Sequence, residues 1–396
     1  MVLKENLSRR KFLAGTGGAL ALTPMMGLNQ IDLPSMAAAQ TGTIITRKLG
    51  RTGIEVPIVS MGVMRATDHP PVIIEAYKQG VRLFDTSRRY ANNEEALGKV
   101  IRDLGVRNQV YIQSKCGQFL PFNSSTAAQR RQWLMEDMDR SLAALQMDYV
   151  DIFLLHAPSM DELNDSGYRE ALTEIKKQKK ARYIGFATHS GVRAEELNNA
   201  AKDGFFDTIT LSFNITMAQD TALLNAIKNA ANAGIGIVAM KTQSGGTGKP
   251  GQAGPPINHT AILKWALRHP EITTAIPGVT NFDHLKEDIS VAFGLDYTDA
   301  ERKFLTDRNL QARLQFCQQC EICVQTCPKG VDIPTLMRTH MYAARYGDFV
   351  YARETFNEIA ENASLKNCTD CASCRAKCAG YVSIADNIRD LKSMYL

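Results

Sequence analysis

The chain has 396 residues, about two to three times the usual length of one domain, so its length predicts more than one folding unit. Its composition, 44% hydrophobic and 22% charged, is that of an ordinary globular protein and excludes collagen, low-complexity polymers and polytopic membrane proteins. The 46 basic and 41 acidic residues give a net charge of +5 without a dominant basic block, so nucleic-acid binding is not expected. Eight of the nine cysteines lie in two short runs near the carboxyl end, a distribution typical of a metal or cluster site.

The amino-terminal segment combines a basic start, an uncharged stretch and a row of small residues. Arg9 and Arg10 precede uncharged residues 12–31, whose glycines make a poor membrane helix, and Ala37 to Ala39 form a site of the kind that signal peptidase needs. The segment resembles a twin-arginine signal peptide over residues 1–39, which implies export to the periplasm and no stable membrane span after cleavage. An exposed basic start before an ordinary amphipathic helix is the alternative interpretation.

Two cysteine runs of the same spacing follow each other at the carboxyl end. Each reads CxxCxxCxxxC, and the residues are Cys317, Cys320, Cys323 and Cys327, then Cys368, Cys371, Cys374 and Cys378. Three closely spaced thiolates and a fourth farther on suit a cubane 4Fe-4S cluster, whereas zinc sites do not need the third close cysteine. Helical periodicity at 333–345 and 348–361 favours an α-helical module over residues 311–396.

This end of the chain resembles a ferredoxin with two 4Fe-4S clusters. The resemblance implies that the fourth cysteine of each run completes the cluster of the other run. Cys378 would then join Cys317, Cys320 and Cys323, and Cys327 would join Cys368, Cys371 and Cys374.

Between the two ends, short β-branched runs alternate with helical stretches. The expected strands are 57–63, 82–87, 109–116, 149–156, 182–188, 208–214, 236–242 and 273–279. The expected helices are 72–79, 94–104, 127–145, 161–179, 194–202, 220–233, 260–268 and 284–293. Eight βα units predict an α/β fold, a (β/α)8 TIM barrel over residues 43–310, followed by the small ferredoxin-like domain.

Three further features refine the barrel interpretation. A doubly wound open sheet is the alternative, but its glycine-rich GxGxxG turn is missing after the first strand. Segments 47–50 and 52–56 read as a hairpin able to cap the bottom of the barrel. Segment 244–256 holds five glycines and three prolines, which predicts a long loop after the seventh strand.

Active sites of this fold lie where the strands end, and four ionisable residues of different kinds occur there. Asp85 ends the second strand, Tyr90 follows in its loop, Lys115 ends the third strand and His156 ends the fourth. We expect the ammonium to lower the pKa of the tyrosine, the carboxylate to hold the ammonium, and the tyrosine to protonate a carbonyl oxygen that the histidine orients. Taken singly, each could instead be a cap, a packing residue, a surface charge or a core histidine.

Four segments make a specific resemblance: LFDTSRRYANNEEALGKVI, YIQSKCG, YVDIFLLHAPS and TAIPGVTNFDHLKED. They are similar to successive signatures of the aldo-keto reductase family, and the likeness runs from residue 47 to about residue 292. It implies that Asp85, Tyr90, Lys115 and His156 form a catalytic tetrad. It also implies reduction of aldehydes and ketones by hydride transfer from a nicotinamide cofactor, usually NADPH.

The same resemblance implies a cofactor pocket in which several positions differ from the family pattern. Thr188 and His189 stand where the carboxamide is held, Thr210 replaces a glutamine, and Met240 stands where an aromatic ring stacks on nicotinamide. Glu287 matches the adenine contact, Gly278 and His284 replace a lysine and an arginine at the 2′-phosphate, and Lys241 and Lys249 are nearby cations. The resemblance implies NADP(H) or NAD(H) as the cofactor, and the altered positions leave open whether nicotinamide is bound and which form it takes. The residues implied in its binding are Thr188, His189, Thr210, Met240, Lys241, Gly278 and Glu287.

Two functions from different classes remain open on the sequence. The first is a periplasmic redox enzyme that acts on a small carbonyl or alcohol substrate while its clusters exchange electrons with a partner protein. The second is an electron-transfer or assembly subunit whose barrel serves as a binding scaffold, which the altered cofactor positions favour. The intact tetrad favours the first.

Overall fold

The structure is a computed structural model that describes residues 42–396 apart from 65, 67–68, 244–256, 308–313, 315, 318, 320, 370, 372 and 379–381. The expected signal peptide at 1–39, the loop at 244–256 and Cys320 thus lie outside the described residues. Within the described residues, no helix combines the length and the apolar character needed to cross a membrane.

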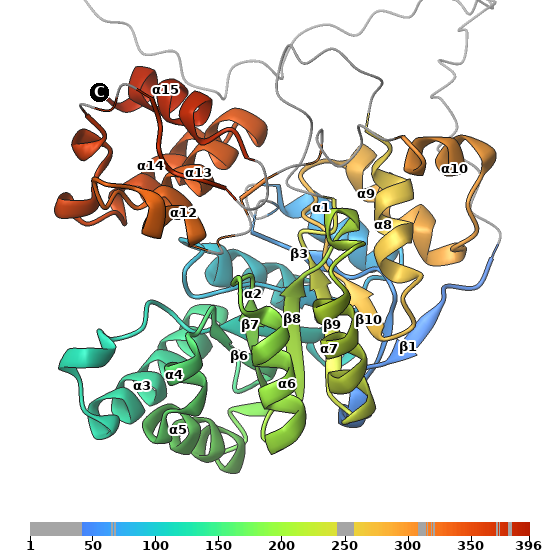
Figure 1. The fold of residues 1–396 in the computed structure, drawn as a ribbon. Coiled ribbons are helices and arrows are strands. Elements are labelled where there is room, and N and C mark those ends of the chain that lie inside the picture. Colours follow the sequence, from blue (N-terminus) through green and yellow to red (C-terminus); the bar gives the residue numbers. More distant parts are fainter. Residues whose placement is uncertain are drawn as a thin grey trace, which may run out of the picture. The chain divides into compact units, whose positions relative to one another are not determined.

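The main sheet has eight strands in the described part of the chain, and all of them run parallel in chain order (Figure 1). They are β3 (Met61–Gly62), β4 (Leu83–Asp85), β5 (Tyr111–Lys115), β6 (Val150–His156), β7 (Ala181–Thr188), β8 (Thr208–Ser212), β9 (Gly236–Met240) and β10 (Ile272–Ala275). The first and last strands meet, because Ser60 N donates to Ala275 O at 2.8 Å and Gly62 N to Pro277 O at 3.0 Å. The sheet is therefore closed, which confirms the (β/α)8 barrel.

Helices follow the strands as expected, with one division and one further helix, at Asp299–Leu305, that the sequence patterns do not predict. They are α1 (Pro70–Lys78), α2 (Asn93–Leu104), α3 (Ala127–Leu145), α4 (Met160–Asn164), α5 (Ser166–Lys177), α6 (Arg193–Asp203), α7 (Thr221–Asn232), α8 (His259–Leu267), α9 (Phe282–Ser290) and α10 (Asp299–Leu305). The single helix expected at 161–179 is divided at Asp165. This residue accepts a bond from Tyr168 N at 3.0 Å as the cap of α5 and pairs with Arg130 at 2.6 Å.

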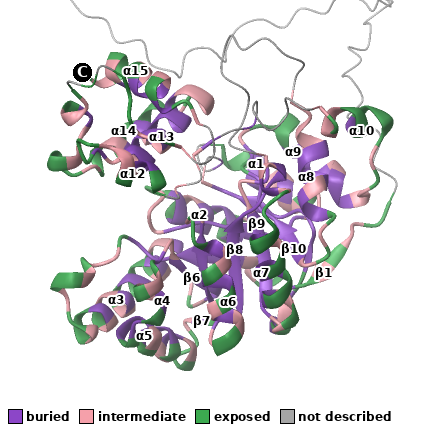
Figure 2. Ribbon diagram, in the orientation of Figure 1, coloured by how far each residue is buried: buried purple, intermediate pink, exposed green. Residues whose placement is uncertain are grey.

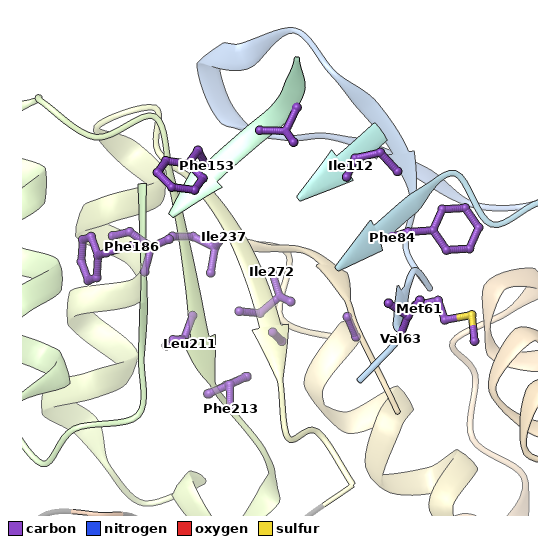
Figure 3. Close-up of a cluster of buried hydrophobic side chains, with 14 of the residues drawn as sticks. Met61, Val63, Phe84, Ile112, Phe153, Phe186, Leu211, Phe213, Ile237 and Ile272 are labelled. Atoms are coloured by element: carbon purple, nitrogen blue, oxygen red, sulfur yellow. The ribbon is translucent and has the colours of Figure 1, made fainter. Parts of the chain in front are cut away.

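The core of the barrel lies between the strands and the surrounding helices (Figure 3). Large side chains on the outer face of the sheet are buried there, among them Phe84, Ile112, Phe153, Phe186, Leu211 and Ile237. Most residues of the barrel strands are buried, while the helices that cover them keep exposed residues on their outer surfaces (Figure 2). This two-layer packing holds the strand ends in place, and the site is built on those ends.

A hairpin closes the bottom of the barrel. Strands β1 (Thr46–Lys48) and β2 (Glu55–Pro57) pair antiparallel, as the sequence predicts. Leu49, Ile54 and Val56 of this hairpin are buried in one cluster with Leu83 and Ile152 of the barrel strands. The barrel is thus plugged at the end opposite to the strand carboxyl ends.

The carboxyl-terminal residues form a helical module with a hydrophobic cluster of its own, as expected. Its helices are α12 (Ile322–Thr326), α13 (Ile333–His340), α14 (Phe349–Asn357) and α15 (Ile384–Tyr395), and α13 continues into a π-helical turn, η6 (Met341–Arg345). Leu336, Ile388 and Leu391 are buried in its cluster, against which several cysteines pack. We call residues 316–396 the cysteine module.

Candidate active site

Asp85 and Lys115 form a buried ion pair at the carboxyl ends of β4 and β5. Lys115 Nζ lies 2.7 Å from Asp85 Oδ2 and 2.8 Å from Thr86 O, and its side chain is 1% exposed. The other carboxylate oxygen of Asp85 accepts a bond from Gln113 Nε2 at 2.6 Å. Both oxygens of the carboxylate have donors and the ammonium has two acceptors, so each of the two buried charges has hydrogen-bond partners, as a buried charge requires.

Tyr90 and His156 stand beside this pair. The Lys115 ammonium lies 5.0 Å from the centre of the Tyr90 ring, and the Tyr90 and His156 rings meet edge to face at 5.7 Å. His156 Nδ1 is 2.9 Å from Ser87 Oγ, which leaves Nε2 as the ring nitrogen available to a ligand. The structure therefore brings together all four residues that the sequence places at the strand ends.

The pKa of Tyr90 differs from the sequence-based expectation. Burial raises it well above the usual value, the carboxylate of Asp85 raises it further, and Arg89 and Arg338 oppose this only in part. Burial likewise lowers the pKa of Lys115 and lowers that of His156 well below its usual value, with the Lys115 charge as the next cause for His156. At neutral pH Tyr90 is thus a protonated phenol and His156 a neutral imidazole.

A cavity of about 390 Å³ opens above these residues at the carboxyl ends of the strands. Asp85, Tyr90 and His156 line it together with main-chain and side-chain groups that follow β9 and β10. The expected cofactor residues that line it are His189, Met240, Lys241, Gly278 and Glu287, and His284 lines it as well. The arrangement offers a proton donor, a neutral imidazole and a concave pocket on one rim.

Two expected cofactor residues do not line the cavity. Thr188 Oγ1 donates to Glu196 Oε2 at 2.5 Å, so its hydroxyl is engaged within the barrel wall. Thr210 accepts a bond from Gln113 Nε2 at 3.1 Å and is fully buried inside the barrel. The sequence places both residues near strand ends but does not show which partner takes the hydroxyl.

Buried polar atoms beside the cavity suit a nicotinamide cofactor. Thr242 Oγ1 and His259 Nδ1 are buried without a partner among the described residues, and both residues line the cavity. Lys241, which precedes Thr242 in the chain, also lines the cavity, and burial, aided by the charge of Arg338, lowers its pKa to about 8. A cation and two unpaired polar groups together fit a phosphate better than they fit an apolar ligand.

The far wall of the cavity comes from the cysteine module, which the sequence did not predict. Arg338 of α13 and Met341, Tyr342 and Arg345 of the π-helical turn line it, as do Tyr346, Tyr351 and Glu358 farther along the chain. The signal that could have indicated this is the concentration of tyrosine and arginine at 338–353 between two cysteine runs. π-Helical turns are also frequent at functional sites.

The two cysteine runs lie together within the cysteine module. Cys317, Cys323, Cys327, Cys368 and Cys378 pack against the same hydrophobic cluster, and the cysteines of the described residues are free of disulfides. Among the described residues no three His, Cys, Asp or Glu side chains converge on a single ion. A cubane cluster does not require that, because each of its thiolates binds a different iron atom. A donor set made only of thiols fits 4Fe-4S clusters.

The tail of each run lies beside the other run. Lys377 N, next to Cys378, donates to Thr326 Oγ1, next to Cys327, at 2.9 Å. Burial raises the pKa of the Cys368 thiol, Lys392 opposes this, and the neighbouring thiols of Cys374, Cys327 and Cys371 raise it further. These neighbours are the thiols that crosswise pairing assigns to one cluster, together with Cys368 itself.

Cys116 stays outside the site. Its thiol is fully buried, accepts a bond from His156 N at 3.3 Å and has its pKa raised by burial, so it remains protonated. This position agrees with a structural thiol.

Sequence profiles of two known families match the chain. The profile of the aldo/keto reductase family matches residues 62–260, and that of a 4Fe-4S dicluster domain matches residues 316–383. The cysteine module thus carries a 4Fe-4S dicluster domain.

Curated proteins similar to this chain are dehydrogenases and reductases. L-galactose dehydrogenase of Arabidopsis thaliana is 24% identical over 300 residues, which cover 66% of this chain and 92% of that protein. Morphine 6-dehydrogenase of Pseudomonas putida is 28% identical over 287 residues, which cover 66% of this chain and 90% of that protein.

Solved structures show the same barrel fold. The holo form of an aldo-keto reductase from Bacillus halodurans has a TM-score of 0.54 at 19% identity and covers 66% of this chain and 95% of its own. An aldo/keto reductase from Klebsiella pneumoniae, solved with NADP and acetate, has a TM-score of 0.52 at 20% identity and covers 66% and 93%.

Proposed function

The chain belongs to the aldo/keto reductase family, and we propose that it is an exported oxidoreductase that interconverts a carbonyl and an alcohol while its clusters exchange electrons with a partner protein. The observation that carries the proposal is that Asp85, Tyr90 and His156 line one cavity, with Lys115 buried behind them and paired with Asp85.

The barrel residues supply the proton chemistry of this reaction. Tyr90, held as a neutral phenol by burial, donates its proton to the oxygen of the carbonyl as that oxygen gains charge. The ammonium of Lys115, held by Asp85, lies against the Tyr90 ring and stabilises the phenolate that results. Neutral His156 orients the carbonyl through its free ring nitrogen.

The cavity residues that would hold a nicotinamide cofactor are Met240, Lys241, Thr242 and His259. Bound nicotinamide supplies the hydride to the carbonyl carbon or accepts it from the alcohol. A family relative solved with NADP supports this proposal. The names of two relatives, a galactose dehydrogenase and a morphine dehydrogenase, support alcohol or carbonyl substrates.

Export and electron transfer are proposed from the two ends of the chain. Clusters are built into a protein before it leaves the cytoplasm. An exported cluster protein therefore needs a route that carries folded chains. Residues 1–39 resemble the signal peptide for such a route, the twin-arginine route. Two clusters can take up or release the two electrons of a hydride one at a time.

An anaerobic absorbance spectrum of the folded, exported protein tests the proposal. We expect iron-sulfur absorption in the visible range together with a retained nicotinamide signal, and reduction or oxidation of that nicotinamide when a carbonyl or alcohol is added. Clusters without bound nicotinamide, and no turnover of supplied NADPH with any aldehyde, would instead establish the barrel as a binding scaffold.

A further inference from the structure

Two arginines and a single carboxylate meet at the proton-donor end of the cavity. Arg338 of α13 donates to Glu358 Oε2 at 2.5 Å, and Arg89 lies 3.6 Å from the same oxygen. Arg89 immediately precedes Tyr90 in the chain, so this cluster joins the cysteine module to the loop that carries the proton donor. Two guanidinium groups share one carboxylate, and the cluster therefore keeps a net positive charge.

The remaining groups around Tyr90 do not cancel this charge. Asp85 is already bound by Lys115 and Gln113, and His156 is neutral. Arg338 Nε is buried and has no hydrogen-bond partner among the described residues, although the side chain lines the cavity. The side chain is partly buried, 18% exposed, and its buried Nε–H can donate to a further acceptor.

The charge of Arg338 reaches the whole reaction end of the cavity. It opposes the rise in the pKa of Tyr90 and contributes to the lowered pKa of His156, His189 and Lys241. An anion placed there would relieve these effects. A carboxylate suits the planar guanidinium fork, which binds it through two parallel hydrogen bonds.

The walls next to the arginines are apolar and aromatic. Met64 of the barrel packs with Met341, Tyr342 and Tyr346 of the cysteine module, and all four line the cavity. The pocket therefore combines a surface for a flat or apolar body with a cationic end near the proton donor.

We propose that the substrate is a carbonyl or alcohol compound that carries a carboxylate, and that Arg338 and Arg89 bind this carboxylate. The inference rests on the proposed carbonyl chemistry of the barrel and adds the class of substrate and a residue, Arg338, that lies outside the barrel. Arg338 is a specificity-determining residue, because it takes no part in proton transfer at Tyr90.

The test compares two aldehydes of equal size, 4-carboxybenzaldehyde and 4-carbamoylbenzaldehyde, on the anaerobic holoprotein. Calorimetry measures the binding of each, and steady-state rates measure the reduction of each. Hydrogen bonds to a charged group correspond to roughly 10- to 100-fold in affinity. We expect the carboxylate to bind at least about tenfold more tightly than the amide, with a difference that shrinks as salt is added.

Variants assign the difference to Arg338. Arg338→Met should raise the KM for the carboxylate aldehyde by about tenfold or more, and leave the KM for the amide aldehyde and the affinity for NADP unchanged. Arg338→Lys should restore part of the lost affinity for the carboxylate aldehyde. Arg389→Met is the matched control, because Arg389 lies on α15, is 75% exposed and does not line the cavity.

The following outcomes would decide whether Arg338 and Arg89 bind a substrate carboxylate. Equal binding of the two aldehydes, no binding of the carboxylate, or an equal loss of both aldehydes in Arg338→Met would overturn the inference. Reduced NADP affinity with unchanged discrimination in Arg338→Met would assign the arginine to a cofactor phosphate and also overturn it. Tight, Arg338-dependent carboxylate binding without any reduction would keep the inference on the ligand and refute the proposed carbonyl chemistry.

Discussion

The proton on Tyr90 depends on burial more than on its neighbours. The low-dielectric surroundings penalise the phenolate, and the nearby Asp85 carboxylate penalises it further, so the free site holds a phenol across the neutral range. The sequence predicted a lowered pKa for Tyr90 instead. It places Lys115 at the neighbouring strand end but does not show how deeply the Tyr90 ring is buried.

Tyr90→Phe keeps the ring and removes the proton. We expect turnover of a carbonyl substrate to fall by on the order of a hundredfold or more, with the melting temperature and cluster absorption unchanged. Turnover at the wild-type rate would exclude Tyr90 as the acid.

Lys115→Met leaves the Asp85 carboxylate buried without its cation. The free energy of unfolding should fall by about 3–5 kcal/mol, which denaturant titration measures. The double variant Asp85→Asn with Lys115→Met removes the stranded charge and should recover part of this loss. A single variant as stable as the wild type would show that Asp85 does not need its partner.

We expect Lys241 to make affinity for the proposed NADP cofactor depend on pH. Its pKa in the free protein is about 8, and a bound phosphate raises it, so affinity for NADP is full below pH 8 and falls as the pH rises above it. Lys241→Arg keeps its charge and should remove this decline. Titrations of NADP between pH 6.5 and about 10 check both; a flat profile in the wild type would separate Lys241 from the phosphate.

At the scale of elements, the sequence predicted the barrel because strand and helix periodicity repeats eight times. All eight strands appear in the described chain; five are shorter by one or two residues at an end, β3 and β10 are shorter by four at one end, and β7 is longer by one. The break between α4 and α5 was missed although the bond by which Asp165 caps α5 is local; its ion pair with Arg130, on another helix, cannot be read from the sequence. Likewise, the partner of Thr188 is Glu196 on α6, and no local pattern indicates such a contact.

The far wall of the cavity could not be predicted either, because contacts between distant elements are not visible in local sequence patterns. Periodicity at 333–345 predicted a helix, but not that its last turn is π-helical or that Arg338 faces the barrel. The four residues of the tetrad could be predicted because the fold brings strand ends to one rim. The far wall could not, because it depends on how the cysteine module packs against the loops of the barrel.

The pairing of the cysteine runs belongs to this scale as well. Cys378→Ala should disturb the cluster of Cys317, Cys320 and Cys323 more than that of its own run, since the tail before Cys378 bonds to Thr326. Paramagnetic spectra of the reduced protein distinguish the two clusters. Loss of only the cluster of Cys368, Cys371 and Cys374 would refute crosswise pairing, and Cys116→Ala, which changes a thiol outside the module, is the control.

For the whole molecule, export should depend on the arginine pair near the amino terminus. Replacing Arg9 and Arg10 by lysine preserves the charge but removes the two guanidinium groups that a twin-arginine receptor reads. The protein should then stay in the cytoplasm with its clusters intact, as cell fractionation and cluster absorption would show. Lys4→Arg and Lys11→Arg serve as controls; normal export of the double-lysine protein would exclude this route.

The cavity wall contributed by helices α13 and α14 makes substrate affinity conditional on the metal centres. These helices lie between the two cysteine runs in the chain, and cysteines of both runs pack against the same hydrophobic cluster as α13, so we expect loss of a cluster to displace them. Oxygen that destroys a cluster would therefore release one side of the pocket and silence the reductase, even for chemistry in which no cluster electron takes part. A chain that has lost a cluster would therefore be inactive and would not act on other substrates instead. Its activity would be determined at the step in which iron and sulfide are inserted.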